Sequence, residues 1–131
     1  MDALARNDDP TLPVRSPHAM AVHSPELAGL EKVRARFLES HYDHHDRLEI
    51  LLERVSRGED VATHLSEAKG MLHRIAGTAG MLGYGRLGTE AREVEYLLDT
   101  ELANAVEQPD RAILAIDRFL DTSMAVCVPD P

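Results

Sequence analysis

The residue in this sequence best placed to do chemistry is His73, which lies in a run of regular helical periodicity. Apolar side chains from Val61 to Leu82 recur in alternating steps of four and three, so they form one stripe along a helix. At about 100° per residue, His73 lies about 130° from the centre of that stripe, and its imidazole is predicted to face solvent. The face that it shares holds small residues and one lysine: Ala62, Ser66, Lys69, Gly70, Ala76, Gly77 and Gly80.

The glycines on this face are costly for a helix. Each glycine in a helix interior costs about 0.8–1 kcal/mol relative to alanine, so Gly70, Gly77 and Gly80 together forfeit roughly 3 kcal/mol. Two explanations are open. Either the glycines let a neighbouring helix approach closely, with His73 at the rim, or they clear space for another protein to reach the imidazole.

Other histidines raise the alternative of a metal site. His41 and His45 are spaced i, i+4, which suits two ligands on one helical face, and His44 and His64 are further candidates. No cysteine lies near them in the sequence, and His41 and His44 fall on the apolar stripe of their own helix. We therefore expect these histidines to be semi-buried bundle residues or surface polar groups, and we predict no metal site.

The elements that must position His73 are four predicted helices. The first begins at Ser24-Pro25-Glu26, which combines an N-cap hydroxyl, a proline at the first helical position and an acid in the first turn. It should stop at Gly58, and Asp60 is predicted to cap the second helix. The Gly83-Tyr84-Gly85 stretch should end the second helix. The stripe of the first helix is Leu30, Val33, Phe37, His41, His44, Leu48, Leu51 and Val55.

The remaining chain predicts two more helices and the overall fold class. Apolar positions between residues 87 and 102 mark the third helix, and Pro109 opens the fourth, with Ile113, Ile116, Leu120 and Met124 inward. Short connections make neighbouring helices antiparallel. We therefore predict an all-α, up-down four-helix bundle over residues 26–124. Residues 1–25, with four prolines and no apolar periodicity, are expected to be a flexible leader, and residues 125–131 a tail.

Composition excludes several classes of partner. The 131 residues include 23 acidic and 14 basic side chains, for a net charge of −9, so neither nucleic acid nor an anionic membrane surface is expected as a partner. No apolar run approaches the roughly 20 residues that span a bilayer, and the first residues do not resemble a signal peptide. The single cysteine, Cys127, suits a reducing compartment, and we expect a cytoplasmic protein.

The segment around His73 resembles the signature of the histidine-containing phosphotransfer (HPt) domain family. That signature places a histidine, any residue, an apolar residue, a lysine and a glycine in sequence. His73, Ile75 and Gly77 match it, whereas Ala76 stands where the lysine is usual. The matching stretch is HRIAGTAGMLG at residues 73–83, followed by Leu87, Ala91 and Glu95.

The resemblance implies a role for several residues. It implies a four-helix bundle whose His73 carries a phosphoryl group between receiver-domain aspartates of a multistep two-component phosphorelay. Lys69 lies about 40° from His73 on the wheel and can replace the missing lysine, whereas Arg74 is turned about 100° away and is a weaker candidate. Gly77 would keep the approach of the receiver open. Gly80 and Ala76 belong to the same supporting set.

The resemblance also implies a carrier without a kinase domain of its own. The sequence has no Gly-rich nucleotide loop and no P-loop. The resemblance further implies that the partner receiver supplies Mg²⁺ and that the chain has no cofactor of its own. Expected partners are response-regulator receivers and a hybrid histidine kinase, and we expect a monomer. Because Ala76 departs from the pattern, a helical adaptor that binds these domains without being phosphorylated stays open as an alternative. A self-associating structural bundle is a third.

Overall fold

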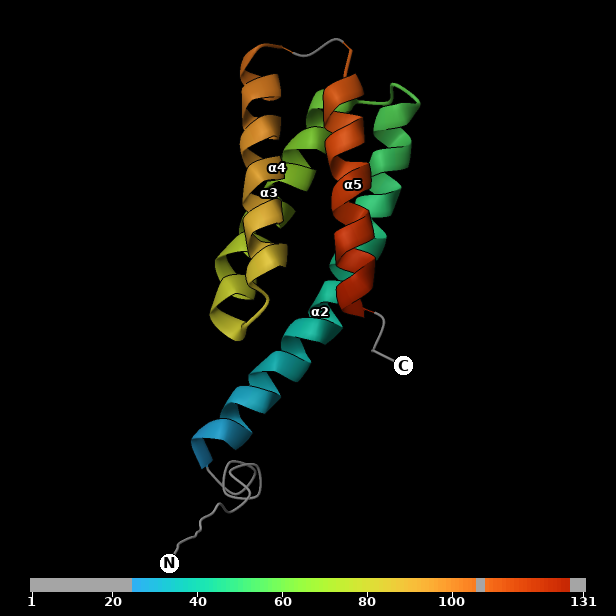
Figure 1. Ribbon diagram of the computed structural model, residues 1–131. Helices are drawn as coiled ribbons and strands as arrows, with labels where there is room; N and C mark the ends of the chain where they lie inside the picture. Colours follow the sequence, from blue (N-terminus) through green and yellow to red (C-terminus); the bar gives the residue numbers. More distant parts are fainter. Residues whose placement is uncertain (1–24, 106–107, 128–131) are drawn as a thin grey trace, which may run out of the picture. The chain divides into compact units, whose positions relative to one another are not determined.

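The computed structural model describes residues 25–105 and 108–127, and this part of the chain is helical without strands. Its elements are α2 (Pro25–Ser56), α3 (Val61–Ala79), the short 3₁₀ helix η1 (Gly80–Leu82), α4 (Gly85–Ala103) and α5 (Asp110–Cys127), as Figure 1 shows. The predicted all-α class is confirmed. The predicted leader, apart from Pro25, and the last four residues of the predicted tail lie outside the described residues.

The chain divides into two compact units, Met1–Arg34 and Ala35–Pro131, and α2 contributes to both. In the first unit the structure describes one helical segment, residues 25–34. Val33 is exposed there, so its predicted inward position is wrong. A single described helical segment offers no second element against which an apolar side chain can pack.

The second unit holds the predicted bundle. From Ala35 onward, α2, α3, α4 and α5 alternate in direction along the chain (Figure 1). The connections are short, at residues 57–60 between α2 and α3 and residues 83–84 between η1 and α4. Each helix contributes a buried apolar stripe, and the largest fully buried apolar side chains are Phe119, Leu48, Leu51, Leu65, Leu72, Ile75, Leu87, Leu98 and Ile116.

Polar contacts between side chains identify which helices are neighbours. They join α2 to α3, α3 to α4, α4 to α5 and α5 back to α2, so the four helices form a closed ring. Consequently the α3–α4 edge of the ring lies opposite the α2–α5 edge. The contacts, in the same order, are Arg47–Glu67 (2.6 Å), Lys69–Asp99 (3.0 Å), Glu90–Thr122 (2.5 Å) and His45–Ser123 (2.8 Å).

The connections use positive-φ residues. Gly58 has φ of 75° just after α2, which agrees with the predicted stop. Gly83 has φ of 93°, and the Tyr84 N–H donates to the Ala79 carbonyl at 2.9 Å, a C-terminal arrangement that only glycine adopts without strain. The second helix therefore ends near Gly83 as predicted, with its last turn tightened to a 3₁₀ helix.

The predicted side-chain cap at Asp60 is wrong. Asp60 has φ of 40° and its carboxylate makes no capping hydrogen bond. A side chain caps a helix from extended backbone, and the left-handed conformation of Asp60 directs the carboxylate elsewhere. Its carbonyl instead accepts a hydrogen bond from the His64 N–H at 3.0 Å.

The inward face of α5 also differs in part from the prediction. Ile116 and Leu120 are buried as expected, but Ile113 is only half-buried and Met124 is 46% exposed. The buried stripe runs in steps of four, three and four, and Met124 lies one residue past its end, about 100° around the helix. Its members are Ala112, Ile116, Phe119 and Ser123.

None of the helices in the described part of the chain is both long and apolar enough to cross a membrane.

Candidate functional site

His73 lies on the solvent side of α3, opposite the helix's core stripe. Its side chain is 74% exposed, whereas the neighbouring Leu72 and Ile75 are buried. The alternation of four- and three-residue steps that buries one side of α3 therefore leaves the imidazole accessible, as the sequence predicted.

The His73 ring is held by a carboxylate on the next helix. Nδ1 of His73 lies 2.8 Å from Oε2 of Glu95 on α4. An ionised carboxylate only accepts hydrogen bonds, so Nδ1 carries the proton and donates it. In the neutral imidazole this leaves Nε2 as the unprotonated nitrogen with an available lone pair. The contact thus selects one tautomer and orients a nucleophilic nitrogen on an exposed ring.

Glu95 had no role assigned from the sequence, although it stands within the segment that resembles the HPt signature. A signal for it exists. Glu95 lies as far after Tyr84 as His73 lies before it, and Asp99 and Lys69 are related in the same way. In an antiparallel helical hairpin, residues equidistant from the turn face one another. This register therefore brings both pairs into contact across the α3–α4 edge.

The glycines beside His73 leave open space. A Cβ atom built on Gly77 or Gly80 meets no side chain or neighbouring helix within 4 Å, and one built on Gly70 meets only the Arg74 guanidinium, at 3.8 Å. Close helix packing therefore does not explain these glycines within the described part of the chain. Gly88 on α4 does serve that purpose, because its Cβ would lie 3.2 Å from the Gly80 backbone nitrogen.

Ala76 is not on the exposed face, which corrects its predicted placement. It is only 7% exposed, and its carbonyl lies 3.5 Å from the Cβ position of Gly88 on α4. On the helical wheel Ala76 lies about 60° from His73, on the side where Lys69 and His73 pair with α4. The close approach at Gly88 therefore covers a position that an isolated helix would expose.

The two candidate cations, Lys69 and Arg74, lie beside different helices. Lys69 forms an ion pair with Asp99 at 3.0 Å, one turn before the His73–Glu95 pair, so both contacts join α3 to α4. Arg74 lies on the α2 side: burial lowers the pKa of His44 on α2, and the nearby Arg74 guanidinium lowers it further. The structure thus brings Lys69 and His73 onto one edge of the bundle and places Arg74 on another.

Three other histidines of the described residues have structural partners. His41 and His45 are buried and both contact the Ser123 hydroxyl, at 2.7 Å and 2.8 Å. Nδ1 of His64 lies 2.7 Å from the Glu59 carbonyl, which suits an N–H donor. In the part of the chain that the structure describes, no group of three His, Cys, Asp or Glu residues is arranged to hold a metal ion.

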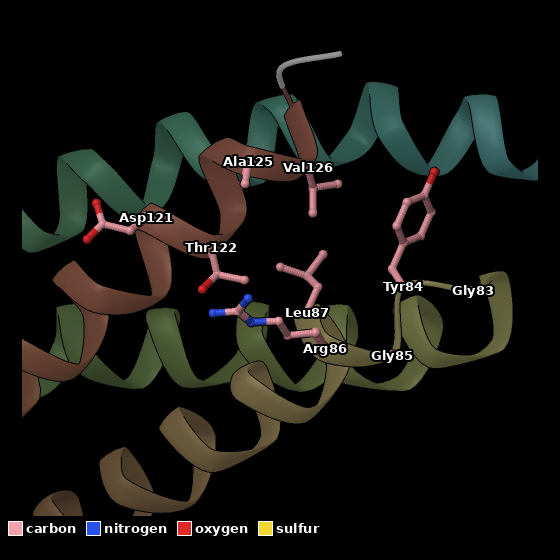
Figure 2. Close-up of a pocket in the computed structure, with 9 residues that line it drawn as sticks. All are labelled: Gly83, Tyr84, Gly85, Arg86, Leu87, Asp121, Thr122, Ala125 and Val126. Carbon is pink, nitrogen blue, oxygen red and sulfur yellow. The ribbon is translucent and has the colours of Figure 1, made fainter. Parts of the chain in front are cut away.

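A pocket of about 370 Å³ opens beside the turn between η1 and α4. Figure 2 shows the Leu87, Thr122 and Val126 side chains around it, with the Arg86 guanidinium beside Thr122. Arg86 is already paired with Glu90 at 2.7 Å. None of the predicted site residues lines this pocket, so it is separate from the His73 site.

A comparison with protein families matches residues 32–125 of the chain to the model described as Hpt domain. Neither the curated proteins nor the solved structures contain a match to the chain. The matched range covers most of α2 and all of α3, α4 and η1, and it ends within α5.

Proposed function

Because the chain belongs to the Hpt domain family, whose members are phosphotransfer modules of two-component phosphorelays, we propose that His73 is the residue that carries the phosphoryl group. The observation that supports this most directly is the 2.8 Å contact between His73 Nδ1 and the Glu95 carboxylate on an exposed ring. It gives one histidine of the described bundle both solvent access and a defined nucleophilic nitrogen.

The proposed reaction is a reversible exchange of one bond. The Nε2 lone pair of His73 attacks the phosphorus of an aspartyl phosphate on a docked receiver domain. An N–P bond forms, the bond between phosphorus and the aspartyl oxygen breaks, and the receiver recovers its carboxylate. The Nδ1 proton stays on the ring, where Glu95 stabilises the positive charge that develops on the imidazole. Transfer to a second receiver is the reverse reaction.

The surface beside His73 suits the approach of another protein. Gly77 and Gly80 present no side chain, and Met81, just beyond them, is 82% exposed. Phosphoryl transfer depends on in-line positioning of the reacting atoms, so bulk beside the ring would hinder it. We propose that the rim of the receiver's active site packs against the surface of Gly77 and Gly80. Met81 would make an apolar contact with the same rim.

Charge neutralisation would be shared between the two proteins. We propose that the receiver supplies Mg²⁺, and that Lys69 replaces the lysine missing at Ala76. Of the two candidate cations, Lys69 is the one on the same edge as His73, although it is held by Asp99 at 3.0 Å. Replacement requires the ammonium group to turn from Asp99 toward the phosphoryl group, one helical turn away.

The test is phosphoryl transfer from receivers phosphorylated beforehand with radiolabelled acetyl phosphate. The wild-type chain should take up a label that is stable in base and labile in acid. The His73→Gln variant should take up none, while its circular dichroism spectrum and unfolding midpoint stay unchanged. Uptake by His73→Gln at the wild-type level would exclude His73 as the acceptor.

A second measurement addresses the adaptor alternative. Receiver binding followed by calorimetry, together with the labelling assay, separates docking from transfer. Receivers that bind the wild-type chain but leave no phosphohistidine would favour an adaptor that does not accept phosphate.

A further inference from the structure

A groove lies on the α2–α5 edge of the bundle, opposite the α3–α4 edge that carries His73. It encloses about 420 Å³. Its floor is apolar and is made by Leu52 of α2 and by Leu120 and Met124 of α5. The exposure of Met124 is therefore part of a larger feature, an apolar channel between two helices. We call it the α2–α5 groove.

Carboxylates line both sides of the α2–α5 groove. Glu49 and Glu53 lie one turn apart on α2, and Asp117 and Asp121 lie one turn apart on α5; all four are exposed. Arg57 pairs with Glu53 at 2.7 Å. Among the described residues Asp117 and Asp121 form no ion pair. The groove is thus an apolar strip between two negatively charged rows.

A buried histidine nitrogen at the groove lacks a partner. His45 lines the groove and is only 4% exposed. Its Nδ1 contacts Ser123, but its Nε2 is buried without a hydrogen-bond partner in the described structure, and the nearest carboxylate oxygen, on Glu49, is 3.7 Å away. A buried polar atom that lacks a hydrogen bond destabilises the folded chain. The lining of the groove therefore includes a polar group that the described structure leaves unsatisfied.

We propose that the α2–α5 groove binds a basic amphipathic helix of a partner protein. Such a helix would lay its apolar stripe on Leu52, Leu120 and Met124 and place Lys or Arg side chains against the two carboxylate rows. The one-turn spacing of the acids matches basic residues three or four positions apart on each flank. Because the groove lies opposite the His73 edge, this partner and a receiver bind at the same time.

The proposal is tested with a synthetic 18-residue helix of leucine and lysine that has one leucine stripe. The comparison peptide has glutamate in place of lysine. Binding to the full chain is followed by NMR of backbone amides, methyl groups and imidazole nitrogens. The lysine peptide should shift the methyl signals of Leu52 and Met124 and the Nε2 signal of His45, with no change at His73. The glutamate peptide should not bind.

Matched variants separate the groove from the general negative charge of the chain. Asp117→Asn/Asp121→Asn should weaken lysine-peptide binding about tenfold. Glu93→Gln/Glu101→Gln removes the same charge from α4 and should change binding less than about twofold. Both variants should accept phosphate as the wild type does, so this test and the test of His73 fail independently.

Three outcomes would overturn the proposal. One is equal weakening in the two double variants, which would mean diffuse attraction to an acidic protein. Another is the absence of binding at millimolar peptide. The third is a shift of His45 Nε2 caused by Zn²⁺ alone and not by the lysine peptide, which would identify the groove as a metal site instead.

Discussion

The α3–α4 edge and the α2–α5 edge of this bundle each hold a histidine whose ring is hydrogen-bonded to an oxygen atom of the neighbouring helix. The two rings differ in their exposure to solvent. On the first edge, His73 contacts the Glu95 carboxylate at 2.8 Å and its ring is exposed. On the second, His41 contacts the Ser123 hydroxyl at 2.7 Å and its ring is fully buried.

Burial changes the chemistry of the second histidine. The pKa of His41 is lowered from 6.5 to about 4, mainly because burial disfavours the charged ring, and further because the His44 and His45 imidazoles lie nearby. Its ring also stacks on Phe37, with centroids 5.5 Å apart. His41 is therefore a neutral core residue, whereas the ring of His73 is open to water and to a partner, as its proposed role as a nucleophile requires. Both rings have a hydrogen-bond partner, so the feature that distinguishes the two histidines is exposure.

The largest effect after loss of His73 itself is expected from blocking access on the exposed edge. Gly77→Gln should slow transfer from a phosphorylated receiver roughly 100-fold, because a side chain next to the ring displaces the receiver from in-line geometry. Stability should stay the same or rise by about 0.5 kcal/mol, since glycine is a poor helix former and the Cβ position is open. Rapid-quench labelling and urea unfolding measure the two quantities.

Thr78→Gln is the matched control, because Thr78 is also exposed but points about 140° away from His73 on the wheel. It should transfer phosphate at the wild-type rate. Equal rates for Gly77→Gln and the wild type would contradict the steric role of the glycines.

Burial of His41 on the α2–α5 edge should make the stability of the chain depend on pH. The unfolded chain protonates His41 near pH 6.5, whereas the folded chain resists protonation until about pH 4. The contribution of neutral His41 to the free energy of unfolding is therefore fully present above pH 6.5. It decreases as the pH falls toward 4. Its loss between pH 7 and pH 4.5 should be about 2 kcal/mol, measured by urea unfolding.

His41→Phe keeps an aromatic ring beside Phe37 but cannot be protonated, so its stability should fall less over the same pH range. His73→Gln should retain the full decrease. A wild-type pH profile that His41→Phe reproduces without change would show that His41 is not the group responsible.

A smaller effect is expected from the partner of the exposed histidine. Glu95→Gln should slow transfer about tenfold, equivalent to ~1.4 kcal/mol, because a neutral amide stabilises the charged imidazole less than a carboxylate does. The ¹⁵N shifts of His73 report the tautomer directly and should show a mixture of Nδ1–H and Nε2–H forms. Unchanged ring shifts together with an unchanged rate would remove Glu95 from the mechanism.

The smallest effect concerns the proposed cation. Lys69→Ala should slow transfer about threefold to tenfold if its ammonium neutralises the phosphoryl group. Asp99→Ala is the informative counterpart, since it releases Lys69 without removing it and should leave the rate unchanged or raise it. Arg74→Ala should have no effect of this size, and a slower rate for Arg74→Ala than for Lys69→Ala would assign the role to Arg74.

Periodicity alone predicted much of the fold and the exposed position of His73. The steps of four and three in α3 require that His73 face away from the core, and Gly83 requires a turn after it, because both follow from local backbone geometry. The sequence did not predict the exposure of Met124. The spacing of apolar residues locates the centre of a buried stripe, but it does not decide whether a residue at the side of the stripe is buried. It also misplaced the backbone of Asp60, where a residue type typical of a cap adopts a left-handed conformation instead.

The sequence by itself determined four helices and an outward His73. Tertiary structure decided what surrounds them, because contacts between helices depend on register and on how closely the backbones approach. The α3–α4 register selected Glu95 as the partner that orients the imidazole, and the absence of a Cβ at Gly88 brought α4 close enough to cover Ala76. Packing of α5 on α2 likewise made Ser123 the shared partner of two buried histidines and left His45 Nε2 unpaired at the opposite edge.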